Sequence, residues 1–272
     1  GNIDGIRFGL TLTIAIVAAE LFNQGNWQRV YACRDNQVVR RSFLGSSLII
    51  LPMVLIAGLL GMMAVQFDLT GDTAFFGLLQ ELNLSGWTLL GVLILALALV
   101  MSSLDTLLNG IASVFTIDLI KFMPTGGNVL KMARLLTVLV GIPAVIIAAQ
   151  GFSVLYLFFV ADLICAALLV PIIISLYNPK QTASNALWSS IAGIVVGLLL
   201  FPKPDFSPLF ASVPGAGDLL HSFGAALLVS TVITILWGAI ASPAKNKTFD
   251  YRTLQAIKPY GEKVGSKEPI LR

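Results

Sequence analysis

The chain has 272 residues, of which 57% are hydrophobic and 11% charged, with a formal net charge of +3. Soluble domains carry about 25% charged residues, so this composition excludes an ordinary soluble domain and favours a protein solvated by lipid. A bilayer core about 30 Å thick needs roughly 20 apolar residues per helix, and seven stretches have this character. They lie at about 8–24, 44–66, 87–120, 133–150, 153–177, 185–201 and 220–241.

The segments between these stretches indicate the orientation, because cytoplasmic loops collect Lys and Arg. Taken alternately, one set of segments holds fifteen of the 17 basic residues, and the other holds only Arg7 and Lys203. We therefore expect the N-terminus outside and the C-terminus inside. The expected cytoplasmic segments are 26–43, 121–132, 178–184 and the tail 242–272, and the expected external loops are 67–86 and 202–219. The net charge thus reports topology, and no nucleic-acid partner is expected.

The first stretch is short, and polar residues from Asn23 to Asn26 interrupt it. A short or interrupted span is the best sequence indication of a broken helix at a transport site. Asn23 and Gln24 would then line a substrate or ion pathway, with Glu20 about one turn before the break. The alternative is that the helix simply ends at Asn23 and that the polar run is the following loop.

The third stretch carries one polar stripe on an otherwise apolar helix. At 100° per residue, the stripe contains Ser102, Asp105, Thr106, Asn109, Ser113 and Thr116. Such a stripe lines a water path or packs on polar neighbours, although helix packing through small residues also favours Ser and Thr. Asp105 argues against simple packing, because a carboxylate at this depth requires a cation, a proton or a basic partner.

The fifth stretch contains Asp162 about ten residues from its start and Pro171 beyond it. A proline within a span kinks the helix and frees a carbonyl group. Asp162 is therefore a candidate proton or substrate site. The alternative is a buried acid that stays protonated and hydrogen-bonded to a neighbouring helix.

Two segments resemble the sodium:solute symporter family. The sequence FNQGNWQRVYACRD at 22–35 is similar to the family's sixth core helix and the loop after it, and MSSLDTLLNGIASVFTIDLIK at 101–121 is similar to its eighth. The resemblance implies an all-α, polytopic membrane protein with about seven transmembrane helices, part of a five-plus-five inverted repeat. Residues 1–178 would form the second repeat of five helices, 179–241 two peripheral helices, and 242–272 a cytoplasmic tail.

Core helices one to five would lie outside this chain. Because the chain does not begin with Met, we expect it to be part of a longer protein whose N-terminal helices are its partners.

The resemblance also implies a set of sodium ligands. Carried over from the family's main sodium site, Ser102 and Ser103 supply paired hydroxyl groups and Leu99 a carbonyl group one turn earlier. Asp105 and Thr106 occupy the positions of a second site that some members have. The family more often has a hydroxyl group where this chain has Asp105, so this carboxylate would either bind sodium more strongly or carry a proton.

The resemblance gives indications about the substrate as well. The polar and aromatic positions of the sugar-transporting branch correspond to Ile16, Ala19 and Phe158, which argues against a sugar. Asn23, Gln24, Asn109 and Asp162 remain the candidate pathway residues.

The leading hypothesis is a multi-pass plasma-membrane protein, in the inner membrane if bacterial, that transports a small polar solute coupled to sodium. No catalytic activity, no organic cofactor and no metal beyond Na⁺ are expected, since the single His221 lies at a helix start. Proton coupling in place of sodium coupling is one alternative. A membrane-embedded sensor built on a transporter-like helix bundle is the other.

Overall fold

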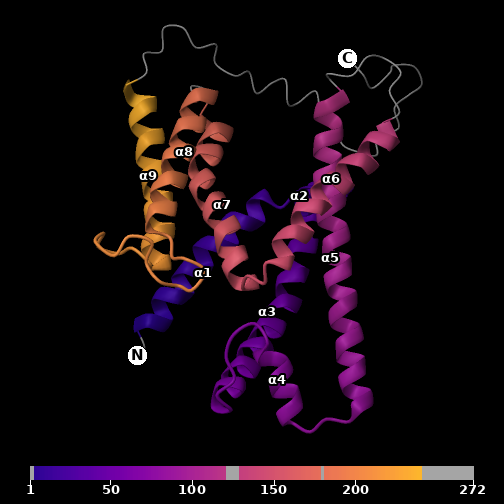
Figure 1. Cartoon of the computed structure of the whole chain (residues 1–272). Coiled ribbons are helices and arrows are strands. Elements are labelled where there is room, and N and C mark those ends of the chain that lie inside the picture. Colours follow the sequence, from indigo (N-terminus) through magenta and orange to yellow (C-terminus); the bar gives the residue numbers. More distant parts are fainter. Residues whose placement is uncertain (1–2, 121–128, 179–180, 241–272) are drawn as a thin grey trace, which may run out of the picture. The chain divides into compact units, whose positions relative to one another are not determined.

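The structure is a computed structural model that describes residues 3–120, 129–178 and 181–240 (Figure 1). These residues form helices joined by turns and loops, and they contain no β-strand. The helices are α1 (Ile3–Phe22), α2 (Gln24–Ala32), α3 (Asn36–Gln66), α4 (Ala74–Glu81), α5 (Gly86–Ile120), α6 (Val129–Ala149), α7 (Val154–Tyr177), α8 (Ala183–Leu200) and α9 (Leu219–Ile240). The expected fold class, an all-α polytopic membrane protein, is confirmed.

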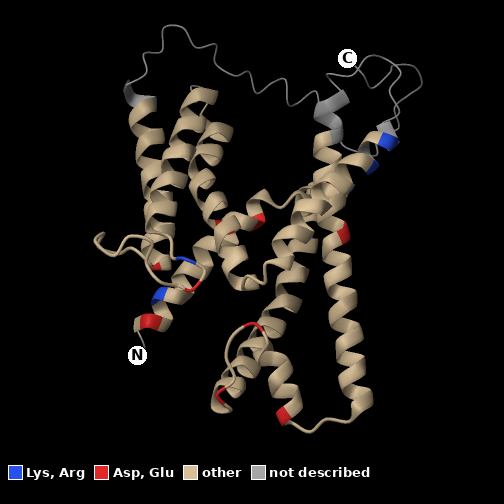
Figure 2. Cartoon of the chain, in the orientation of Figure 1, with Lys and Arg blue, Asp and Glu red and all other residues tan. Residues whose placement is uncertain are grey.

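Six of these helices, namely α1, α3, α5, α7, α8 and α9, are long and apolar enough to cross a membrane. The remaining expected span, 133–150, corresponds to α6, whose apolar part Arg134–Ala149 is shorter. The loop expected at 67–86 contains a further short helix, α4, which the sequence did not predict. Along their described lengths α8 and α9 carry no Lys, Arg, Asp or Glu (Figure 2).

The chain divides into two compact units. Of the described residues, one unit contains 3–23, 152–178 and 181–240, and the other contains 24–120 and 129–151. The first unit therefore holds α1, α7, α8 and α9, and the second holds α2 to α6. The division into a repeat at 1–178 and two peripheral helices at 179–241 rests on the family resemblance and stays a prediction. The expected tail, 242–272, lies outside the described residues.

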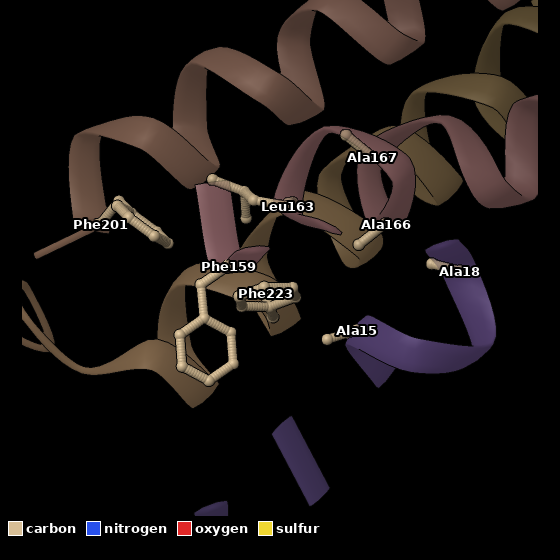
Figure 3. Packing of buried hydrophobic residues seen from close by; sticks show 9 residues of the cluster. Ala15, Ala18, Phe159, Leu163, Ala166, Ala167, Phe201 and Phe223 are labelled. Carbon is tan, nitrogen blue, oxygen red and sulfur yellow. The ribbon is translucent and has the colours of Figure 1, made fainter. Parts of the chain in front are cut away.

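The first unit has a core built from small and aromatic side chains. Ala15 and Ala18 of α1 meet Ala166 of α7 in a buried cluster that also includes Phe159 and Phe223 (Figure 3). The Phe159 ring packs edge-on against Phe223, with ring centroids 6.0 Å apart. Small residues let helix backbones approach closely, and this close packing holds helices together where lipid removes the hydrophobic driving force.

Two glycines of α8 face its neighbours at very short range. A Cβ atom added to Gly193 would lie 2.7 Å from the carbonyl oxygen of Ala226 and 2.9 Å from the Cβ of Ser230. A Cβ added to Gly197 would lie 2.9 Å from the Cβ of Ala226. The spacing of these glycines is the Gly-x-x-x-Gly pattern of close helix pairs. The contact between α8 and α9 therefore depends on the absence of side chains at both positions.

Buried hydrogen bonds connect the same two helices. The hydroxyl group of Ser222 on α9 donates to the carbonyl oxygen of Gly197 at 2.7 Å. Nearer the other end, the side-chain amide of Asn185 donates to the carbonyl oxygen of Thr234 at 3.1 Å. Both donor side chains are fully or almost fully buried. Because an unpaired polar group in a dry environment is costly, these bonds also fix the rotation of α8 against α9.

The second unit leaves much of its apolar surface uncovered by protein. On α3, which continues through Pro52, Leu48 is 77% exposed, and on α5 Met101 is 69% exposed. Within the unit, α5 packs against α6 and α2, and α3 packs against α4. In water such surfaces would associate, so lipid or further transmembrane helices must cover them.

At the start of α9, Asp218 acts as an N-terminal cap and as an ion-pair partner. Its Oδ1 accepts hydrogen bonds from the backbone N–H groups of Leu220 at 2.8 Å and His221 at 3.3 Å. Its Oδ2 pairs with the guanidinium group of Arg7 on α1. Burial alone would raise the pKa of Asp218, but the hydrogen bonds from His221 and Leu220 and the charge of Arg7 together lower it below 3.8.

Replacing Asp218 with alanine is therefore expected to destabilise the protein by about 1 kcal/mol, chiefly through the lost cap. A carboxyl group with a lowered pKa contributes stability above its unfolded pKa and loses it as it takes up a proton. The difference between wild type and Asp218→Ala should persist at pH 7 and pH 5 and decline as the pH falls below about 3.8 and through the lowered pKa of Asp218. Thermal unfolding in detergent at these pH values measures it.

Asp205→Ala is the matched control, because Asp205 lies in the same connection and its Oδ1 accepts from the backbone and hydroxyl groups of Ser207 within the loop. We expect a smaller loss in this exposed loop. An equal loss in both variants would contradict the role given to Asp218.

Candidate functional site

The polar stripe predicted on the third span lies on α5, a helix of 35 residues. At 1.5 Å per residue it is about 52 Å long, and the stripe begins near its middle and runs toward its C-terminal end. Ser102, Ser103, Asp105 and Asn109 have exposed side chains, and Thr106 is half-buried. The side chain of Thr116, placed on the same stripe from the sequence, lies outside the described residues.

Hydrogen bonds within the helix order part of this stripe. The Nδ2 of Asn109 donates to the Oδ1 of Asp105 at 3.1 Å, which holds the carboxylate along the helix. The hydroxyl group of Thr106 donates to the carbonyl oxygen of Ser102 at 2.9 Å. Among the described residues no group hydrogen-bonds to the hydroxyl of Ser102 or Ser103. The stripe therefore presents hydroxyl and carboxylate oxygens on a helix surface that is otherwise mostly apolar.

Leu99 lies one turn before these serines, and its side chain is 62% exposed. A helical carbonyl group has two lone pairs, of which the helix uses one. The carbonyl oxygen of Leu99 thus keeps acceptor capacity toward the same face of α5.

Gln28 is a polar partner of α5 that was not predicted from the sequence. The Nε2 of Gln28 on α2 donates to the hydroxyl group of Ser113 at 3.0 Å, and this hydroxyl donates to the carbonyl oxygen of Gly110 at 2.8 Å. Gly110 is buried, and a Cβ there would lie 3.5 Å from the Cβ of Gln24. The segment 24–28 therefore packs on the stripe's continuation. The polar run after Asn23 was the only available signal for this contact.

The first span is interrupted at one residue. Helix α1 ends at Phe22, Asn23 is not helical, and α2 begins at Gln24. The N–H group of Asn23 donates to the carbonyl oxygen of Glu20 at 3.4 Å, which ends the hydrogen-bond pattern of α1. The polar run that follows Asn23 is thus helical and not an irregular loop. The two sides of the break belong to different compact units.

The first unit contains a second group of acidic residues. Asp162 is half-buried on α7, next to the fully buried Leu163. Glu20 on α1 lies near enough for the two carboxylates to repel each other when both are charged. Helices α1 and α7 pack together in this unit. Asp162 is thus brought together with Glu20, whereas the stripe on α5 belongs to the other unit.

A cavity of about 450 Å³ lies elsewhere in the first unit. Arg7, Thr11, Phe206 and Asp218 are among its lining residues, which come from the starts of α1 and α9 and the connection before α9. None of the site residues expected from the sequence lines it. It is therefore distinct from the candidate transport site.

The sequence model of the sodium:solute symporter family matches residues 3–193. The matched region spans α1 to the middle of α8 and includes the stripe on α5, the break at Asn23 and Asp162. No solved structure matches the chain. Members of this family are solute transporters rather than enzymes, and the six apolar helices agree with a multi-pass protein of the plasma membrane. The chain belongs to the sodium:solute symporter family.

Proposed function

We propose that this protein moves a small polar solute across the membrane together with sodium. The observation that carries the proposal is the row of hydroxyl and carboxylate oxygens on α5, an otherwise apolar helix. Polar groups at such a position are costly unless they face a cavity or a partner. A solute transporter supplies both, because its pathway is hydrated and its coupling ion needs ligands.

Sodium is a hard cation, and hard cations prefer oxygen ligands. We assign the carbonyl group of Leu99 and the hydroxyl groups of Ser102 and Ser103 to the main sodium site. Asp105 and Thr106 would contribute to a second site. The exposure of the serine side chains supports this assignment, because the family's main sodium site takes its remaining ligands from the first core helix.

The solute and ion pathway is assigned to Asn23, Gln24, Asn109 and Asp162. The interruption at Asn23 supports this assignment, because a broken helix offers backbone groups that no helical bond uses. Sodium bound on α5 would raise the affinity for the solute by linkage, and the solute would raise the affinity for sodium by the same factor. The protein needs no covalent chemistry for this coupling.

Proton coupling is the second candidate function, and the acidic residues support it. Asp105 stands where the family more often has a hydroxyl group, and Glu20 and Asp162 form a further pair of neighbouring acids. A carboxyl group can take up and release a proton during transport, whereas a serine or threonine hydroxyl group cannot.

One transport experiment separates the two. In proteoliposomes containing the transporter with all its helices, an inward sodium gradient at equal pH should drive accumulation from a panel of small polar solutes. An inward proton gradient without sodium should not. Accumulation under the proton gradient alone would overturn sodium coupling. If neither gradient drives accumulation of any solute in the panel, the proposed transport of these small polar solutes is wrong.

A further inference from the structure

Helix α2 and the first two turns of α3 form a strongly basic segment, which we term the basic corner and define as residues 24–43. It contains four arginines and one acidic residue. All four arginine side chains are exposed: Arg29, Arg34, Arg40 and Arg41. The whole corner belongs to the second compact unit. The positive-inside rule explains why such residues lie in a cytoplasmic segment, but it does not explain their arrangement on two helix ends.

The single acid of the corner is already engaged. Asp35 caps α3 by accepting a hydrogen bond at 2.8 Å from the backbone N–H of Val38, and its Oδ2 lies 3.4 Å from the Nε of Arg34. The hydrogen bond from Val38, followed by the contact with Arg34, holds the pKa of Asp35 below its ordinary value. Among the described residues no carboxylate forms an ion pair with Arg29, Arg40 or Arg41. Three positive charges of the corner thus remain uncompensated by the described residues.

Aromatic side chains mark the depth of the corner in the membrane. Trp27 and Tyr31 are 48% and 58% exposed, and their spacing of four residues places them on one face of α2. Gly25, on the opposite side of α2, is buried, and the exposed Gln28, which bonds to α5, lies next to Trp27 in the sequence. Trp and Tyr concentrate at the level of lipid headgroups. Helix α2 therefore presents exposed side chains of the interfacial type.

The arginines stand directly before an apolar helix surface. Arg40 and Arg41 occupy the second turn of α3, and the apolar run begins at Phe43 and Leu44, which are 55% and 58% exposed. Basic groups near a helix N-terminus gain nothing from the helix dipole, so their placement there does not stabilise α3. A molecule bound by these arginines would have its apolar part beside the exposed side chains that follow.

We propose that the basic corner binds the headgroup of an anionic phospholipid, with the lipid phosphate held by Arg40 and Arg41 and the acyl chains lying along α3. Guanidinium groups bind phosphate oxygens through paired hydrogen bonds. A free phosphate ion would use only the arginines. The exposed Trp27, Tyr31 and α3 surface fit a ligand that also has an interfacial and an apolar part, which commits the proposal to a lipid.

The test counts lipid molecules retained by the purified protein, so it does not depend on transport. Native mass spectrometry of the protein titrated with phosphatidylglycerol or phosphatidylcholine of the same acyl chains gives an apparent Kd for each. Wild type should retain phosphatidylglycerol in preference to phosphatidylcholine. Each basic residue near an anionic headgroup contributes about fivefold in affinity, so Arg40→Gln with Arg41→Gln should weaken retention of phosphatidylglycerol about 30-fold.

Lys131→Gln with Arg134→Gln is the matched control, because it removes the same charge from α6 of the same unit. It should leave the apparent Kd nearly unchanged. Arg40→Lys with Arg41→Lys should retain most of the affinity, and Arg29→Gln alone should lose about fivefold, which keeps the test valid if the double glutamine variant does not fold. Equal retention of both lipids by wild type would overturn the proposal. An equal loss of affinity for phosphatidylglycerol in the α6 control would also overturn it, because the preference would then follow from the overall charge of the protein.

Discussion

Gly193→Ala will lower the free energy of unfolding by about 1–3 kcal/mol, the usual cost of inserting a methyl group into a closely packed interior. The new Cβ would lie 2.7 Å from the carbonyl oxygen of Ala226, a backbone atom that cannot turn aside. Helices α8 and α9 must then separate, which also strains the hydrogen bond from Ser222 to Gly197. Thermal unfolding in detergent, followed by circular dichroism, measures the loss.

Gly224→Ala is the matched control on α9, because a Cβ there meets no atom within 4 Å. Alanine is the better helix former by up to about 1 kcal/mol, so this variant should be neutral or slightly stabilised. Gly193→Leu should cost more than Gly193→Ala, since the side chain is larger at the same contact. If Gly193→Ala is as stable as Gly224→Ala, the inference that α8 and α9 pack closely at Gly193 is wrong.

In uptake measurements, Ser103→Ala should raise the sodium concentration for half-maximal transport roughly five- to hundredfold. The reason is the loss of one hydroxyl ligand of the proposed sodium site, where a polar group that closes over the bound ion is worth about 1–3 kcal/mol. Ser102→Ala should act in the same direction, and a double variant should be weaker than either. The measurement is initial uptake against sodium concentration in the transporter with all its helices, with surface expression matched between variants.

Ser47→Ala provides the control for this experiment. The hydroxyl group of Ser47 donates to the carbonyl oxygen of Phe43 within α3. The variant therefore also removes a serine hydroxyl group from a helix, but at a position outside the stripe. Ser103→Thr keeps a hydroxyl group and should restore much of the sodium affinity. Unchanged sodium dependence in both Ser102→Ala and Ser103→Ala would remove α5 from the proposed sodium site.

The long helices could be predicted from sequence because their length follows from the membrane thickness. The expected stretch at 44–66 lies within α3, and the stretch at 153–177 almost coincides with α7. Helix α4 escaped prediction because its eight residues are too few to form a span, although they are mostly apolar. The expected stretch at 133–150 likewise lies within one residue of the apolar part of α6, Arg134–Ala149. Length and hydropathy thus predicted spans, and short helices between them remained hidden.

The candidate site was predictable only in part. The stripe on α5 is a local pattern, so helical spacing alone placed Asp105 and Asn109 on one face. The bond from Gln28 to Ser113 joins residues 85 positions apart and has no local signature. The nearness of Glu20 to Asp162 is likewise a product of tertiary packing. The sequence also could not distinguish a broken helix at Asn23 from a helix end followed by a loop, because polar residues are compatible with both.

The cluster formed by α1 with α7 has a consequence for biogenesis. Ala15 and Ala18 of α1 are buried by helices that are synthesised only after the segment 24–151. At 5–20 residues per second, ribosomes need roughly 6–26 s to make that segment. During this interval α1 has left the ribosome, but its packing partners do not exist. Among the span-forming helices α1 also shares the lowest hydropathy, 1.7, with α8. Its retention in the membrane during synthesis therefore falls to the insertion machinery and lipid rather than to its own final contacts.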